Sequence, residues 1–121
     1  MNHMRQLNEQ PVFDRNFGMS MAAGRTDIYE RMLHKALGYW DQQGEFKPLL
    51  ELDAYHCDIG RMGELAHRAA GACRVCGMRR LADHLSAIFR VCDAGDLPAA
   101  EVLGAELPNL LNTTREQVLG H

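Results

Sequence analysis

The sequence of 121 residues predicts an all-α protein, an up-down antiparallel four-helix bundle with one or two short accessory helices. Apolar residues recur at helical spacing along the long segments, no segment shows the alternation of a β-strand, and the connections are only a few residues long. Short connections make consecutive helices antiparallel neighbours. We expect one helical domain over residues 12–121, because residues 1–11 are polar and aperiodic, as in a linker or an expression remnant.

The first part of the domain is expected to hold one short and one long helix. The short helix spans Asp14 to Ala22, is ended by Ala23-Gly24, and forms a lid on the core. The long helix starts at Thr26, a residue type common at N-caps, and continues until Gln43-Gly44.

A proline and an aspartate mark the next two helix starts. Pro48 suits the first turn of a short helix that continues to about Cys57. Asp58 is expected to cap a long helix that runs to about Cys76 and is broken by Gly77.

The last two helices follow this glycine. The first carries apolar residues at helical spacing from Met78 to Phe89 and ends before the turn Ala94-Gly95-Asp96. The second opens at Leu97-Pro98, and Pro108 should kink or split it.

Composition and charge exclude several classes of protein. The chain is 46% apolar and 24% charged, no apolar run approaches the length of a membrane span, and the first residues lack the basic and apolar regions of a signal peptide. We therefore expect a cytoplasmic protein without direct membrane contact. No glycine-rich phosphate loop indicates intrinsic ATP chemistry.

The charge is unevenly distributed along the chain. The net charge is −3, but residues 61–80 hold five arginines against the single acid Glu64, which makes this window +4 and the remainder −7. Such a positive region suits a phosphoryl group or an acidic partner surface. We expect no nucleic-acid partner, because the overall balance is acidic and the window contains no aromatic residue.

One histidine, His67, lies at the centre of a bare helix face. At about 100° per residue, the apolar residues opposite it are Met62, Leu65, Ala69, Ala72, Cys73 and Cys76. Within about 60° of it lie Gly60, Gly63, Ala70, Gly71 and Arg74. The imidazole is therefore expected to point away from the core. Glycine is disfavoured inside helices, so these glycines suggest that another surface approaches closely.

The residues around His67 carry a resemblance to a known family. Leu65-Ala66-His67 is followed by Gly71, by small residues at 72 and 73, by Gly77 and by Leu81-Ala82. This pattern resembles a histidine phosphotransfer (HPt) domain, and Pro11-Val12-Phe13-Asp14 is similar to the entry of such domains at the C-terminus of bacterial hybrid sensor histidine kinases.

The resemblance implies a function in a two-component phosphorelay. His67 would accept a phosphoryl group from the aspartyl phosphate of one response-regulator receiver domain and pass it to another, including the receiver of its own hybrid kinase. The receiver would supply Mg²⁺, so the chain would need no cofactor or metal of its own and would be a monomeric intermediate rather than an enzyme. Gly63, Glu64, Ala70 and Gly71 would form the docking surface.

The sequence departs from the family pattern at a residue of implied importance. Ala70 stands where the family usually has a lysine that lends positive charge near the phosphohistidine. Arg74, about 20° from the histidine direction, is our first candidate to replace this charge, and Arg68 is the second.

Two other functions remain open. One is a docking scaffold that binds receivers or kinases without being phosphorylated. The other is a metal or redox module, because Cys73 and Cys76 form a CxxC pair. Further ligands for that module would be Cys57, Cys92, His56 or His84. If His84 has only a structural role, we expect it to be a partly buried, hydrogen-bonded side chain.

Overall fold

The computed structural model describes residues 10–120, and within them the chain is entirely helical, without a strand. The elements are α2 (Arg15–Met21), α3 (Thr26–Gly38), the 3₁₀ helix η1 (Lys47–Leu50), α4 (Leu52–Cys57), α5 (Ile59–Val75), α6 (Arg79–Asp93) and α7 (Leu97–Leu119). The all-α fold class is thereby confirmed. Most of the expected linker, residues 1–9, lies outside the described residues.

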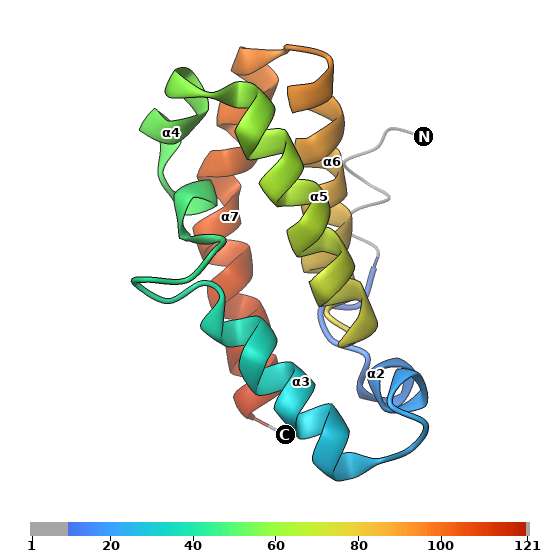
Figure 1. Ribbon diagram of the computed structural model, residues 1–121. Coiled ribbons are helices and arrows are strands. Elements are labelled where there is room, and N and C mark those ends of the chain that lie inside the picture. The colour runs from blue at the N-terminus through green and yellow to red at the C-terminus, as the bar shows by residue number, and fades with distance from the viewer. Residues whose placement is uncertain (1–9, 121) are drawn as a thin grey trace.

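Three long helices make the main packing contacts. α5 packs along α6, α6 packs along α7, and η1 and α4 lie against both α5 and α7. Following the colours in Figure 1, α5, α6 and α7 run in alternating directions, and α3 enters from the end of the molecule where α7 finishes. The short α2 contacts both α3 and α5.

Local capping signals place α5 and the turn after it. The Asp58 side chain accepts a hydrogen bond of 3.0 Å from the backbone N–H of Arg61, as expected for an N-cap. Gly77 lies in the turn between α5 and α6 and has a φ of +85°, a conformation that favours glycine. The Gly77 carbonyl accepts a hydrogen bond of 2.7 Å from Asp14, so the chain entering α2 is attached to this turn.

The helix α2 lies against the α5–α6 turn. Asp14 caps it by accepting from Phe17 N–H at 3.0 Å, and the buried Gly18 gives room for Tyr29. The Tyr29 hydroxyl donates to the Cys76 carbonyl at 3.0 Å, and burial raises the pKa of Tyr29 to about 12. These contacts join α2, α3 and the end of α5.

The end of the expected linker is also attached to the domain. The backbone N–H of Arg80 donates to the Pro11 carbonyl at 3.1 Å, and its Nε donates to the Gln10 carbonyl at 2.9 Å. Both residues therefore lie against the first turn of α6.

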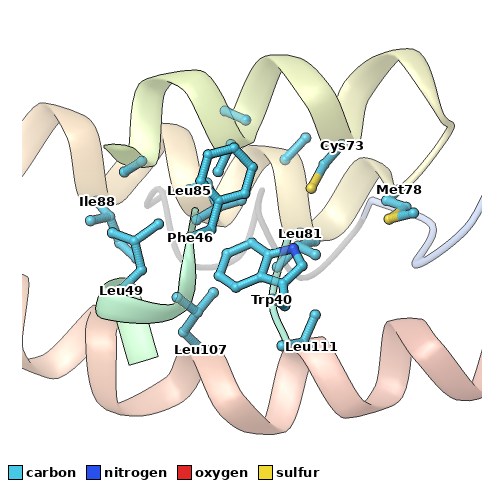
Figure 2. Packing of buried hydrophobic residues seen from close by; sticks show 14 of the residues in the cluster. Trp40, Phe46, Leu49, Cys73, Met78, Leu81, Leu85, Ile88, Leu107 and Leu111 are labelled. Atoms are coloured by element: carbon cyan, nitrogen blue, oxygen red, sulfur yellow. The ribbon is translucent and has the colours of Figure 1, made fainter. Parts of the chain in front are cut away.

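The helix α3 is shorter than the sequence pattern predicts. It ends at Gly38 rather than at Gln43-Gly44, and Thr26 is its first residue rather than its N-cap. The chain leaves the helix to bury Trp40 and Phe46, whose ring centroids lie 5.5 Å apart. Figure 2 shows both rings in the core between α6 and α7. Burying two aromatic side chains outweighs a further turn of exposed helix.

The segment after Pro48 forms two elements where one helix was expected. Glu51 has extended backbone angles between η1 and α4. This break lets Leu49 and Tyr55 both reach the core, and the Tyr55 hydroxyl donates to the Leu49 carbonyl at 2.9 Å.

The helix α7 continues through Pro108, so of the two expected effects of this proline, a kink or a split, the split does not occur. Asp96 caps its start, and Leu107 and Leu111 on either side of the proline are buried. Packing along the helix therefore compensates for the hydrogen bond that proline removes. No helix among the described residues has the length and apolar character needed to cross a membrane.

The core lies between α5, α6 and α7, and Leu81, Leu85 and Ile88 project into it from α6 (Figure 2). His84 is 6% exposed, and its Nε2 lies 2.8 Å from the Leu103 carbonyl, which ties α6 to α7. The hydrogen bond expected of His84 is confirmed, and the side chain is buried more fully than the sequence-based interpretation expected.

Candidate functional site

His67 lies in the middle of α5 with its side chain exposed, as the helical periodicity predicts. Within residues 10–120, no hydrogen bond or ion pair engages its imidazole. Neither ring nitrogen therefore has a partner among the described residues. A neutral imidazole in this setting has a nitrogen lone pair available as a nucleophile or ligand.

Among the residues that the structure describes, the ring contact to His67 comes from Phe89 on α6. The two ring centroids lie 4.7 Å apart with an interplanar angle of 42°. Sequence reasoning placed Phe89 only on the apolar side of its helix and missed this contact. The signal that could have found it is the hairpin about Gly77, which brings residues ten before and twelve after the glycine to the same level.

The residues beside His67 divide into a covered side and an open side. Gly63 and Ala70 lie about 40° and 60° from the histidine in one direction, toward α6, and Gly71 and Glu64 lie by similar angles in the other. Gly63 and Ala70 are buried, the latter 3% exposed, whereas Glu64 and Gly71 are exposed. The expectation that Gly63 and Ala70 belong to an exposed docking edge is therefore wrong, because α6 covers them.

The glycines next to His67 serve different purposes. A Cβ on Gly63 would lie 2.9 Å from the Cβ of Cys92 and 3.9 Å from Phe89 Cδ1. The close approach that this glycine suggests is therefore made by α6 of the same chain. A Cβ on Gly71 would meet nothing within 4 Å, so the surface one turn after the histidine is open.

Arg74, the first candidate for a charge beside the histidine, is engaged with α6. Its Nη2 lies 3.5 Å from Asp83 Oδ1 and 3.2 Å from Ser86 Oγ. Its position on α5 leans toward α6, by about 20° from the direction of His67, which explains these partners. No contact joins Arg74 to the imidazole.

Arg68, the second candidate, contacts the connection between α3 and η1 instead of α6. Its Nη1 forms an ion pair of 2.5 Å with Glu45, in the connection between α3 and η1. Arg79 also pairs with an acid outside the arginine-rich window, since its Nη1 lies 3.8 Å from Asp14. Three of the five arginines that make residues 61–80 positive are thus paired with acids from other segments. Sequence counting could not show this neutralisation.

A pocket of about 240 Å³ opens beside Phe89. Its lining residues are Gly60, Gly63, Glu64, Phe89, Cys92 and Asp93. Within residues 10–120, neither Glu64 nor Asp93 has an ion-pair partner. The wall of the pocket is mixed, since Phe89 and Cys92 are apolar and its charged residues, Glu64 and Asp93, are acidic.

Comparison with known proteins adds no assignment: no protein-family model, curated protein or solved structure matches this chain. The function must therefore be argued from the residues themselves.

The cysteines and the other histidines within residues 10–120 do not converge on a site. Cys73, Cys76 and Cys92 are buried free thiols, whereas Cys57 is exposed. Burial raises the pKa of the Cys76 thiol to about 11 and also raises the pKa of Cys73 and Cys92. In the part of the chain that the structure describes, no three His, Cys, Asp or Glu side chains gather as a metal site would require. His56 lies 3.4 Å from Glu101 on the surface.

Proposed function

We propose that this chain is a histidine phosphotransfer domain of a two-component phosphorelay, with His67 as the phosphoacceptor. The observation that carries the proposal is the exposed imidazole of His67, which has no hydrogen-bond partner within residues 10–120 and stands beside the open surface at Gly71. A phosphoacceptor histidine must be reached by a second protein, and this arrangement leaves the approach unobstructed. The resemblance of the motif around His67 to HPt domains supports the same function.

The fold is consistent with that family. We infer an up-down antiparallel four-helix bundle of α3, α5, α6 and α7, with α2, η1 and α4 as short accessory elements. The alternating directions of α5, α6 and α7 in Figure 1 support this arrangement. In it, α5 presents His67 from the middle of a rigid helix, which holds the nucleophile in place better than a loop. The chain would act in the cytoplasm as a monomer.

The chemistry requires little from the chain itself. A lone pair on one imidazole nitrogen forms the P–N bond while the O–P bond of the receiver's aspartyl phosphate breaks, and the electron pair of that bond returns to the aspartate carboxylate. The other imidazole nitrogen keeps its proton. The second transfer reverses these steps toward the aspartate of another receiver. Mg²⁺ and the remaining charge stabilisation come from the receiver, so this chain contributes the nucleophile and the docking surface.

The test is phosphoryl transfer from a receiver. The purified chain is incubated with a phosphorylated receiver domain and Mg²⁺, and acid-labile, alkali-stable phosphate on the chain is mapped by mass spectrometry. We expect label on His67, no label in His67→Gln, and unchanged label in the control His34→Gln, which alters another exposed histidine. Label that persists in His67→Gln would contradict the proposal, as would a chain that no receiver labels.

One observation favours a second candidate, a docking scaffold that is not phosphorylated. Arg68 and Arg74 are both paired with acids, so neither contacts the imidazole to balance the charge of a phosphoryl group. The same experiment separates the two functions. A scaffold binds a receiver in a pull-down or a titration but takes up no phosphate.

A further inference from the structure

We propose that Phe89 is the positioning residue of His67, holding the imidazole in the orientation that phosphoryl transfer requires. This inference rests on the proposed function. It starts from the ring contact of 4.7 Å between the two side chains, on a histidine that no hydrogen bond within residues 10–120 orients. Ring pairs at this separation are attractive and geometrically specific.

Phe89 is itself held in place by its surroundings. It is half-buried and packs against the core, whereas His67 is exposed. Its Cδ1 would lie 3.9 Å from a Cβ on Gly63, so its ring packs at van der Waals distance beside this position of α5. The close approach of α5 and α6 at Gly63 and Cys92 therefore seats the phenyl ring next to the histidine. The packed phenyl ring can therefore limit the rotation of the exposed imidazole ring.

A ring contact restrains the imidazole differently from a hydrogen bond. A hydrogen bond from a neighbouring side chain would occupy one ring nitrogen and select one tautomer. Contact with a phenyl ring limits rotation about the side-chain torsions but occupies neither nitrogen. His67 is thus oriented while both nitrogens remain free, which suits a residue that must both receive and return a phosphoryl group.

The expected effect of losing this contact follows from rotamer counting. An unrestrained histidine samples about three staggered rotamers of its first torsion and a broad range of its second. In-line transfer between two docked proteins accepts few of these orientations, because small misplacements of reacting atoms are costly. We expect Phe89→Leu to lower the transfer rate at saturating receiver by roughly threefold to tenfold. The receiver concentration at half-maximal rate should stay the same.

The experiment compares Phe89→Leu and Phe89→Tyr with the unchanged chain, using two phosphoryl donors. One donor is the phosphorylated receiver, and the other is phosphoramidate, a small molecule that reaches the imidazole from any direction. In Phe89→Leu the rate of phosphoryl transfer from the receiver should fall, while the rate of labelling by phosphoramidate should stay the same. Phe89→Tyr should keep both rates, because it keeps an aromatic ring at this position. The ring protons of His67 should move in the NMR spectrum of Phe89→Leu, since the ring current of Phe89 is lost.

Three outcomes would overturn the positioning role. The first is an unchanged rate with the receiver, and the second is an equal loss with both donors, which would indicate a general structural effect. The third is a change only in the receiver concentration at half-maximal rate, which would make Phe89 a docking residue. If no receiver labels the unchanged chain while phosphoramidate does, the proposed function fails, and the positioning role fails with it. If only the positioning role is wrong, the receiver labels the unchanged chain and Phe89→Leu equally well, so the two failures can be told apart.

Discussion

Arg74 on α5 is tied to Asp83 on α6, with Nη2 of the arginine 3.5 Å from Oδ1 of the aspartate. Arg74 lies seven positions after His67, about 10 Å along the helix axis. The arginine side chain can span much of this distance only by leaving Asp83 and Ser86. A phosphoryl group on His67 would therefore compete with a carboxylate for the same guanidinium. Because the arginine and the aspartate are both partly exposed, this ion pair is weak.

The first prediction concerns this competition. Asp83→Asn should remove the ion pair of Arg74, which keeps its contact with Ser86, and lengthen the lifetime of phosphorylated His67. Arg74→Ala should shorten that lifetime or slow transfer. The change in lifetime should be roughly twofold to fivefold, since exposed charge interactions are worth less than about 1 kcal/mol. The measurement is the decay of His67 phosphate after the receiver is removed. Arg31→Ala, which removes an exposed arginine on α3, is the control and should have no effect. If the decay is the same in all four proteins, Arg74 takes no part in the site.

The second prediction concerns the open side of the histidine. Gly71→Arg should abolish transfer from a receiver without altering the fold, because a side chain at this position meets nothing within 4 Å in the free protein and would stand in the path of a partner. Gly71→Ala should raise the free energy of unfolding by about 0.5 to 1 kcal/mol, since alanine is the better helix former. Denaturant unfolding and transfer assays on the same preparations check both expectations. Normal transfer by Gly71→Arg would move the docking surface elsewhere.

The third prediction concerns the covered side. Gly63→Ala should lower the free energy of unfolding by roughly 1 to 3 kcal/mol, because the added methyl group would lie 2.9 Å from the Cβ of Cys92 and must push α5 and α6 apart. The same change at Gly71 is the matched control, with the opposite sign. Equal stability of the two variants would contradict the close helix contact at Gly63.

The fourth prediction concerns thiol reactivity and its pH dependence. In the native protein at pH 8, a thiol reagent should label Cys57 fast and Cys73 and Cys76 only after unfolding, because the latter two are buried. The pKa of Cys76 is raised to about 11 from an ordinary value of 9.0, so between these values the unfolded chain releases protons that the folded chain keeps. Stability should therefore be complete below about pH 9 and fall as the pH rises toward 11. Mass spectrometry of labelled protein and unfolding curves at several pH values test this. Fast native labelling of Cys73 would show that the core opens readily.

Some of the architecture could be predicted from local signals. Asp58 and Asp96 cap α5 and α7, and Gly77 takes the positive φ that ends a helix, because each of these roles depends on a few neighbouring residues. The same reasoning was wrong at the end of α3 and about a split of α7 at Pro108. There, contacts with residues distant in the sequence, at Trp40, Phe46 and Leu107, outweighed local preference.

For the candidate site, the sequence by itself determined that His67 faces outward, because the periodicity of a helix sets the direction of each side chain relative to its own apolar side. Only the tertiary structure decided what stands beside the histidine. The position of α6 buries Gly63 and Ala70, brings Phe89 against the imidazole and engages Arg74. Helical periodicity carries no information on which side of a residue the neighbouring helix lies, and ion pairs join residues whose separation in sequence says nothing of their distance in space.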